Sequence, residues 1–233
     1  MSTNQRRKSN IEKYVGIAVF SALAVAVAFV CNAVIPPVAG FLSLDMKDAI
    51  IAIASFIYGP ISAVIISFIA ALIEFVTFST TAWYGFIMNF ASSAVFSLTA
   101  SLIYKKLRNI NGALISFFAA IVATTGVMLL LNIFVTPLYL VAFMGMPSEV
   151  ASTTVMGMLA EVLLPFNFAK SLLNSAVAIL IYKPIATAIR ATRLASGGKA
   201  SLRFNRNSVI ILIVGGVATA LSIGIIFWLN MPK

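Results

Sequence analysis

Long apolar runs recur along the whole chain, and they constrain the fold more than any other feature of the sequence. We delimit seven runs, at residues 14–36, 46–58, 61–79, 84–104, 112–143, 153–182 and 208–230. A helix of about 20 residues crosses the hydrocarbon core of a bilayer, and most of these runs reach that length. They do not alternate polar and apolar residues as the strands of a membrane barrel would. The sequence therefore predicts an all-α, multi-pass membrane protein.

The residues that are missing exclude several kinds of active site. The chain has no histidine, and its one cysteine, Cys31, lies inside the first run. Histidine-metal sites, Ser-His-Asp triads and intrachain disulfides are therefore excluded. The segment GGKAS at residues 197–201 lacks the first glycine of a phosphate-binding Walker loop and the Ser or Thr directly after its lysine. We expect no ATP hydrolysis by that route.

Basic residues gather in three segments: before the first run, after the fourth run and after the sixth run. They include Arg6, Arg7, Lys8, Lys13, Lys105, Lys106, Arg108, Lys183, Arg190, Arg193, Lys199, Arg203 and Arg206. If the seven runs cross alternately, these segments share one side, and such basic segments face the cytoplasm. We therefore expect a cytoplasmic N-terminus. The net charge of +10 then comes mostly from basic residues in the cytoplasmic segments. We therefore expect no nucleic-acid partner.

The runs divide the chain into four parts. Residues 1–13 form a cytoplasmic N-terminal segment, and residues 14–189 form one compact helical bundle. Residues 190–207 are basic and contain Gly and Ser, which is typical of a cytoplasmic linker lying near anionic lipid headgroups. Residues 208–230 form an additional transmembrane helix, which we interpret as an accessory anchor.

Two amides and an ammonium interrupt the sixth apolar run, LLPFNFAKSLLNSAVAIL at residues 163–180. Asn167, Lys170 and Asn174 are spaced by three and four residues, so they share one helix face. A charge at this depth costs at least ~2.5 kcal/mol, and we expect Lys170 to face the bundle interior or a water-filled cavity. A structural salt bridge to Glu74 is an alternative, and the two interpretations are compatible.

Other runs supply polar and aromatic companions. They are Trp83, Tyr84, Gly85, Asn89, Ser92 and Ser93 near and within the fourth run, and Asn132 midway along the fifth. Each alone is typical of helix packing in a membrane. Together they predict a pocket for an amphipathic, aromatic molecule, with amides that read its polar edge.

The segment GFLSLDMKDAI at residues 40–50 places acidic residues before the second run. Asp45 and Asp48 either cap the N-terminus of that helix or belong to a loop that closes over an external site. In the first run, Ala18, Ala22 and Ala26 recur at every fourth position. Small residues at this spacing favour close approach of another helix, so we predict that this alanine stripe docks a partner subunit.

Four segments, in order along residues 14–190, resemble one known family. They are FLSLDMKDAIIAIASFIYGPISAVII, WYGFIMNF, LLNIFVTPLY and LLPFNFAK. They resemble the riboflavin-binding substrate-binding (S) components of energy-coupling factor (ECF) transporters, the RibU type. The resemblance implies a six-helix bundle in a bacterial cell membrane that captures riboflavin from outside. It also implies three partners, a transmembrane coupling subunit and two cytoplasmic ATPases. The additional C-terminal helix departs from the six-helix pattern.

The resemblance also implies roles for individual residues. Asn167 and Lys170 would contact the flavin, Asn132 would hydrogen-bond it, and Gly85 would leave room for it. The predicted ligand-binding residues are Leu42, Ser43, Leu44, Asp45, Gly85, Asn89, Asn132, Asn167, Lys170 and Asn174. Riboflavin would be a transported ligand and not a cofactor, with its phosphate, FMN, as a further candidate.

Two alternatives to riboflavin capture stay open. One is an S component for another vitamin, and the other is an integral-membrane enzyme such as a lipid-headgroup transferase. The enzyme would need clustered carboxylates for a metal, and Asp45 and Asp48 are the only close acidic pair. The residues favour a non-catalytic binding subunit.

Overall fold

The computed structural model describes residues 3–107, 110–193 and 206–231. The helices are α1 (Thr3–Val34), α2 (Lys47–Tyr58), α3 (Pro60–Thr77), α4 (Ala82–Leu107), α5 (Ile110–Met144), α6 (Ser148–Met158), the π-helical turn η1 (Leu159–Leu163), α7 (Leu164–Arg193) and α8 (Arg206–Leu229). No strand is present in these ranges, so the prediction of an all-α membrane bundle with an additional C-terminal helix is confirmed. Most of the predicted linker, residues 194–205, lies outside the described residues.

Six helical stretches in the described part of the chain are long and apolar enough to cross a membrane. The second predicted run is not among them. It forms α2, a helix of 12 residues that rises only about 18 Å. All seven predicted runs thus lie in helical stretches, and the run at 46–58 forms the shortest of those seven stretches. Residues 35–46, which we call loop 1, lead from α1 into the bundle, so that α2 starts among buried residues.

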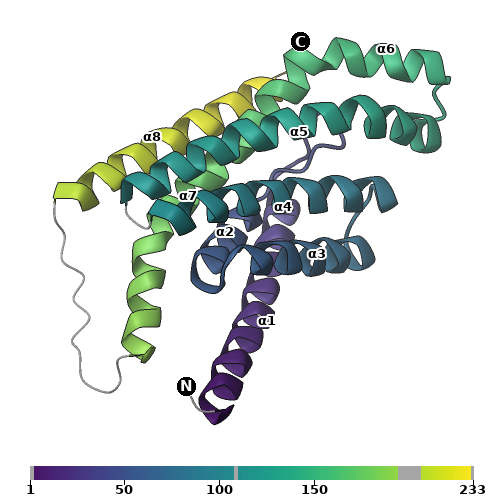
Figure 1. Cartoon of the computed structure of the whole chain (residues 1–233). Coiled ribbons are helices and arrows are strands. Elements are labelled where there is room, and N and C mark those ends of the chain that lie inside the picture. The colour runs from purple at the N-terminus through teal and green to yellow at the C-terminus, as the bar shows by residue number, and fades with distance from the viewer. Residues whose placement is uncertain (1–2, 108–109, 194–205, 232–233) are drawn as a thin grey trace.

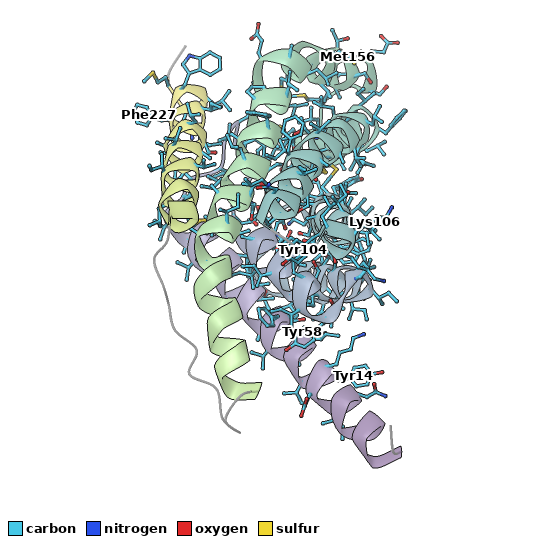
Figure 2. All side chains as sticks on the ribbon, turned by 60° about the vertical axis from the view of Figure 1, so that its left-hand side comes forward. Tyr14, Tyr58, Tyr104, Lys106, Met156 and Phe227 are labelled. Carbon is cyan, nitrogen blue, oxygen red and sulfur yellow. The ribbon has the colours of Figure 1, made fainter. Side chains whose placement is uncertain are left out.

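The turn between α2 and α3 lies against α1. Gly59 has a φ of 97°, a conformation that glycine adopts without steric cost. Pro60 then starts α3, where its missing N–H is not needed. A Cβ built on Gly16 of α1 would overlap the ring end of Tyr58, so a larger residue at position 16 would require the Tyr58 side chain to shift. The α2–α3 turn thus reaches the level of the N-terminal part of α1, where Figure 2 shows Tyr58 and Tyr14.

The sixth predicted run, 153–182, is not one straight helix. The chain forms α6, then the π-helical turn η1, and only then α7. In the turn, the N–H of Leu164 donates to the carbonyl of Leu159, five residues earlier. Pro165 follows in the first turn of α7, where a missing N–H is tolerated. As a result α6 runs back along the end of α5 before α7 descends through the bundle (Figure 1).

The most buried helix is α2. Its residues 47–55 are all buried, because α1, α3, α4 and α7 pack around it. The outer faces of the other helices are apolar, as lipid contact requires. Phe227 on α8, for example, is 66% exposed and points away from the bundle (Figure 2). Figure 1 shows α8 packed along α7, and Ile226 of α8 joins the same apolar cluster as Val38 of loop 1.

Candidate functional site

A cavity of about 90 Å³ opens between loop 1, α4, α5 and α7. Its lining residues are Phe41, Leu42, Ser43, Thr81, Tyr84, Gly85, Met88, Asn89, Ser92, Met128, Asn132, Val135, Thr136, Tyr139, Phe166, Asn167 and Lys170. Loop 1 and the three helices come from different parts of the sequence, and their side chains meet at this cavity. One part of the wall is aromatic and another is polar, which suits an amphipathic ligand.

Aromatic rings form one wall of the cavity. Tyr139 of α5 lies between Phe41 of loop 1 and Tyr84 of α4, with ring centroids 5.8 and 6.1 Å apart. Phe143, one turn after Tyr139, stacks on it at 5.1 Å. These rings connect loop 1 to two helices, so they can cover the face of a flat ligand.

Two buried amides face the cavity from α5 and α7. Asn132 donates to the carbonyl of Met128 at 2.7 Å and accepts from the Thr136 hydroxyl at 2.7 Å. Asn167 donates to the carbonyl of Leu163 in the π-helical turn at 2.8 Å. An amide offers two donors and two acceptor lone pairs, so these bonds orient each group and leave capacity for a ligand.

Lys170 also lines the cavity, and it forms a salt bridge with a residue other than Glu74. Its ammonium lies 2.8 Å from the carboxylate of Asp45 and 3.4 Å from the carbonyl of Ser43. Glu74 instead pairs with Lys47, at 3.0 Å. Lys47 starts α2 between loop 1 and α3 and also lies 3.2 Å from Asp45. The alternative interpretation of a structural salt bridge thus holds for Lys170, but the partner is Asp45 and not Glu74.

These four charged residues form one buried network, with Asn89 donating to Glu74 at 3.1 Å. Burial alone would raise the pKa of Asp45. The ammonium groups of Lys170 and Lys47 outweigh that effect and hold the pKa of the Asp45 carboxyl well below its usual range. Asp45 is therefore ionised at neutral pH, and it ties loop 1 to both α2 and α7.

The N-terminus of α2 is satisfied mainly from other parts of the chain. The N–H of Ala49 donates to the Asn174 side chain at 2.9 Å, and Asn174 donates to the carbonyl of Asp45 at 2.9 Å. Asp45 accepts the N–H of Lys47 at 3.2 Å, whereas Asp48 accepts from the Ser93 hydroxyl. The expected capping of α2 thus involves Asp45, and Asn174 supplies a second acceptor.

The cavity brings together seven of the ten predicted ligand-binding residues. They are Leu42, Ser43, Gly85, Asn89, Asn132, Asn167 and Lys170. Leu44 and Asp45 line a smaller neighbouring cavity. Asn174 is fully buried and lines neither cavity. Direct contact between Asn174 and a ligand therefore has no support from its position.

Sequence reasoning missed several lining residues. On α5, Thr136 and Tyr139 follow Asn132 by four and seven residues. That spacing puts all three on one helix face, so the pattern could have identified them. Phe41 directly precedes the predicted loop residues Leu42 and Ser43. A single aromatic residue in a loop does not by itself indicate a ligand contact.

The alanine stripe lies on the outside of α1. Ala18, Ala22 and Ala26 are exposed, whereas Ala24 and Ala28 pack into the bundle. The structure thus leaves a smooth outer strip of small side chains on α1.

The described residues contain no group of three His, Cys, Asp or Glu side chains placed to hold a metal ion.

Comparison with known proteins identifies the family. A family model for the substrate-specific component of ECF transporters matches residues 14–182. The riboflavin transporter RibU of Staphylococcus aureus (strain TCH60) is 30% identical over 193 residues, which cover 80% of this chain and 98% of that protein. The riboflavin transporter FmnP of Bacillus subtilis (strain 168) is 27% identical over 175 residues, which cover 74% and 90%.

A solved structure gives the same result for the fold. The S component of a bacterial ECF transporter superposes with a TM-score of 0.62 at 28% identity, covering 78% of this chain and 99% of that one. The family match spans the loop, the amides and the lysine that meet at the cavity. The chain belongs to the substrate-specific (S) components of ECF transporters.

Proposed function

We propose that this chain captures riboflavin from outside the cell for uptake by an ATP-driven ECF transporter. The observation that carries the proposal is the meeting of Asn132, Asn167 and Lys170 beside aromatic rings in one cavity. The riboflavin transporters among its relatives support the choice of vitamin. The isoalloxazine ring of riboflavin has apolar faces and a polar edge of donors and acceptors, which matches these two kinds of wall.

In the proposed binding mode, Phe41, Tyr84 and Tyr139 cover the flavin faces while Asn132 and Asn167 hydrogen-bond its edge. Lys170 adds a charge-assisted donor. A protein cavity that takes a single benzene ring measures on the order of 150 Å³, and the cavity here is about 90 Å³. We therefore expect loop 1 and its aromatic neighbours to move outward when a three-ring flavin binds.

The chain depends on partners for energy in this proposal, and it is not an enzyme. The exposed strip of Ala18, Ala22 and Ala26 supports docking onto a transmembrane coupling subunit, since small side chains let two helices approach closely. The absence of a Walker loop from the sequence is consistent with ATP hydrolysis by two separate cytoplasmic ATPase subunits. FMN is a second candidate ligand, and no resident cofactor is required.

The proposed orientation in the bacterial cell membrane has a cytoplasmic N-terminus. The excess of Lys and Arg at the start of α1, at the end of α4 and from the last part of α7 to the start of α8 supports it. The cavity then lies toward the outer side, beside loop 1 and the start of α7, where an external vitamin reaches it.

A panel of vitamins tests the proposal against the other-vitamin alternative. The full chain is purified in detergent and its melting temperature is measured with riboflavin, thiamine, biotin and folate. A ligand that binds only the folded state stabilises it, by about 2.7 kcal/mol at one hundred times the dissociation constant. We expect riboflavin alone to raise the melting temperature. Stabilisation by a different vitamin and not by riboflavin would replace the flavin assignment.

A further inference from the structure

The additional helix α8 lies outside the part of the chain that the family shares. The family model ends at residue 182, whereas α8 spans Arg206–Leu229. The solved S component is matched over 99% of its length by 78% of this chain, so it has no unmatched segment long enough to form such a helix. Any role of α8 is therefore an addition to the function that the family shares.

One end of α8 enters the apolar core beside the larger of the two cavities, which we call the main cavity. Ile226 of α8 is only 7% exposed, and it belongs to the same continuous cluster as Val38 of loop 1. Leu42 of loop 1 and Phe166 of α7 are members of that cluster as well, and both line the main cavity. The packing of α8 is thus continuous with the wall of the cavity.

Loop 1 forms a tight hairpin at this cluster. Val38 and Leu42 exchange two backbone hydrogen bonds, each of 3.0 Å. Because these bonds close the turn, we expect its residues to move as one unit. Val38 is fully buried in the cluster, so an outward shift of the hairpin has to draw Val38 away from close-packed neighbours. Packing around Val38 therefore resists opening of loop 1.

We propose that α8 acts as a brace that holds loop 1 in its inward position and slows ligand entry, with Ile226 as the positioning residue. This inference rests on the proposed function, in which loop 1 moves outward to admit a three-ring flavin. Lipid chains are as apolar as α8, so the brace acts through close packing and not through removal from water. It lowers the fraction of ligand-free chains that are open to a ligand, and the apparent affinity falls with that fraction.

Ile226→Ala tests the brace through the rate of riboflavin binding to the full, purified chain. Loss of most of a buried apolar side chain is large enough for us to expect association about threefold or more faster, with no loss of affinity. Damage to the site would instead slow association or weaken binding. Ile223→Ala makes the same change where α8 is 56% exposed, and it should leave the association rate unchanged.

Thiol labelling of the ligand-free chain tests the brace without riboflavin. Leu44 lies in loop 1, is 5% exposed and belongs to the same cluster. In a Cys31→Ala background, Leu44→Cys should therefore react with a soluble maleimide mainly while loop 1 is away from the bundle. Combination with Ile226→Ala should make labelling about threefold or more faster. Combination with Ile223→Ala should leave the labelling rate unchanged.

The outcomes separate the brace from the proposed function. If the folded, unmodified chain does not bind riboflavin, the proposed function is wrong, and the labelling rates decide whether α8 holds loop 1. If riboflavin binds and Ile226→Ala leaves either rate unchanged or slows association, riboflavin capture stands and the brace does not. Should Ile226→Ala fail to fold, the milder Ile226→Val decides. We then expect both rates to rise about twofold, and unchanged rates would overturn the proposal.

Discussion

Lys170 and Lys47 are both buried ammonium groups, but they contact different parts of the molecule. Lys170 faces the main cavity and shares Asp45 with Lys47. Lys47 is 1% exposed and holds two carboxylates, Asp45 and Glu74. Removing Lys170 still leaves Asp45 paired, whereas removing Lys47 leaves Glu74 without its cation. The two lysines should therefore separate ligand affinity from stability.

The change Lys170→Met should weaken riboflavin binding much more than it weakens the fold. Methionine keeps the length and apolar packing of the side chain and loses a charge-assisted donor. Such a bond contributes about 1.5–3 kcal/mol, or about ten- to a hundredfold in dissociation constant. Riboflavin affinity and the ligand-free melting temperature are the two measurements.

The matched control is Lys47→Met, which breaks a buried ion pair that does not line the main cavity. Loss of one partner in such a pair costs about 3–5 kcal/mol, so its ligand-free melting temperature should fall sharply. If Lys170→Met lowers the melting temperature as much as Lys47→Met and leaves affinity unchanged, Lys170 is structural and does not contact the ligand.

The sequence indicated the site residues better than their partners. The spacing of Asn167 and Lys170 on one helix face follows from helical geometry alone. The partner of Lys170 does not, because Asp45 and Glu74 are both acidic residues far away in sequence. The choice between them depends on loop 1, which lies in the bundle through tertiary contacts such as the hydrogen bond from Asn174 to Asp45. Residue type and spacing carry no information about such contacts.

At the scale of elements, the apolar runs predicted where helices form. They did not predict how deeply each helix is buried in the bundle. The run at 46–58 looks like a short span, but as α2 it is a buried helix that starts inside the bundle. In the run at 153–182, Pro165 is compatible with a helix that begins there, as α7 does, but the residue pattern did not reveal that the preceding helix α6 runs back along α5. In both places a polar side chain, Asn174 or Asn167, hydrogen-bonds the backbone near a helix end inside the protein. Hydropathy does not reveal such hydrogen bonds.

The change Ala22→Trp should leave riboflavin binding intact and abolish uptake in cells. Ala22 is exposed on the outer strip of α1, so an indole there blocks close approach of another helix. Binding by the purified chain and uptake of labelled riboflavin by cells are the measurements. Val217→Trp on the exposed face of α8 is the control, and it should leave uptake normal. Unchanged transport by Ala22→Trp would make the strip an ordinary lipid-facing surface.

At the scale of the whole molecule, the two ends of the bundle differ in charge. Tyr14, near the basic N-terminal segment, and Met156, on α6, lie at opposite ends (Figure 2). The acidic Glu149 lies in the first turn of α6. This polarity supports a cytoplasmic N-terminus with the cavity toward the outside.

Cysteine labelling in intact cells tests that orientation. In a Cys31→Ala background, Glu149→Cys should react with a membrane-impermeant thiol reagent added outside, and Lys13→Cys should react only after the membrane is opened. Both side chains lie outside the core of the bundle, since neither is buried. The reverse pattern of labelling would invert the topology and place loop 1 in the cytoplasm.

The most direct test of riboflavin capture by this chain is a titration of riboflavin with the purified, unmodified protein and no other subunit present. The cavity lies within the chain, between loop 1, α4, α5 and α7, so binding needs no partner. We predict that flavin fluorescence is quenched to an endpoint near one riboflavin per chain. A folded, monodisperse sample that leaves the fluorescence of micromolar riboflavin unchanged would contradict the proposal.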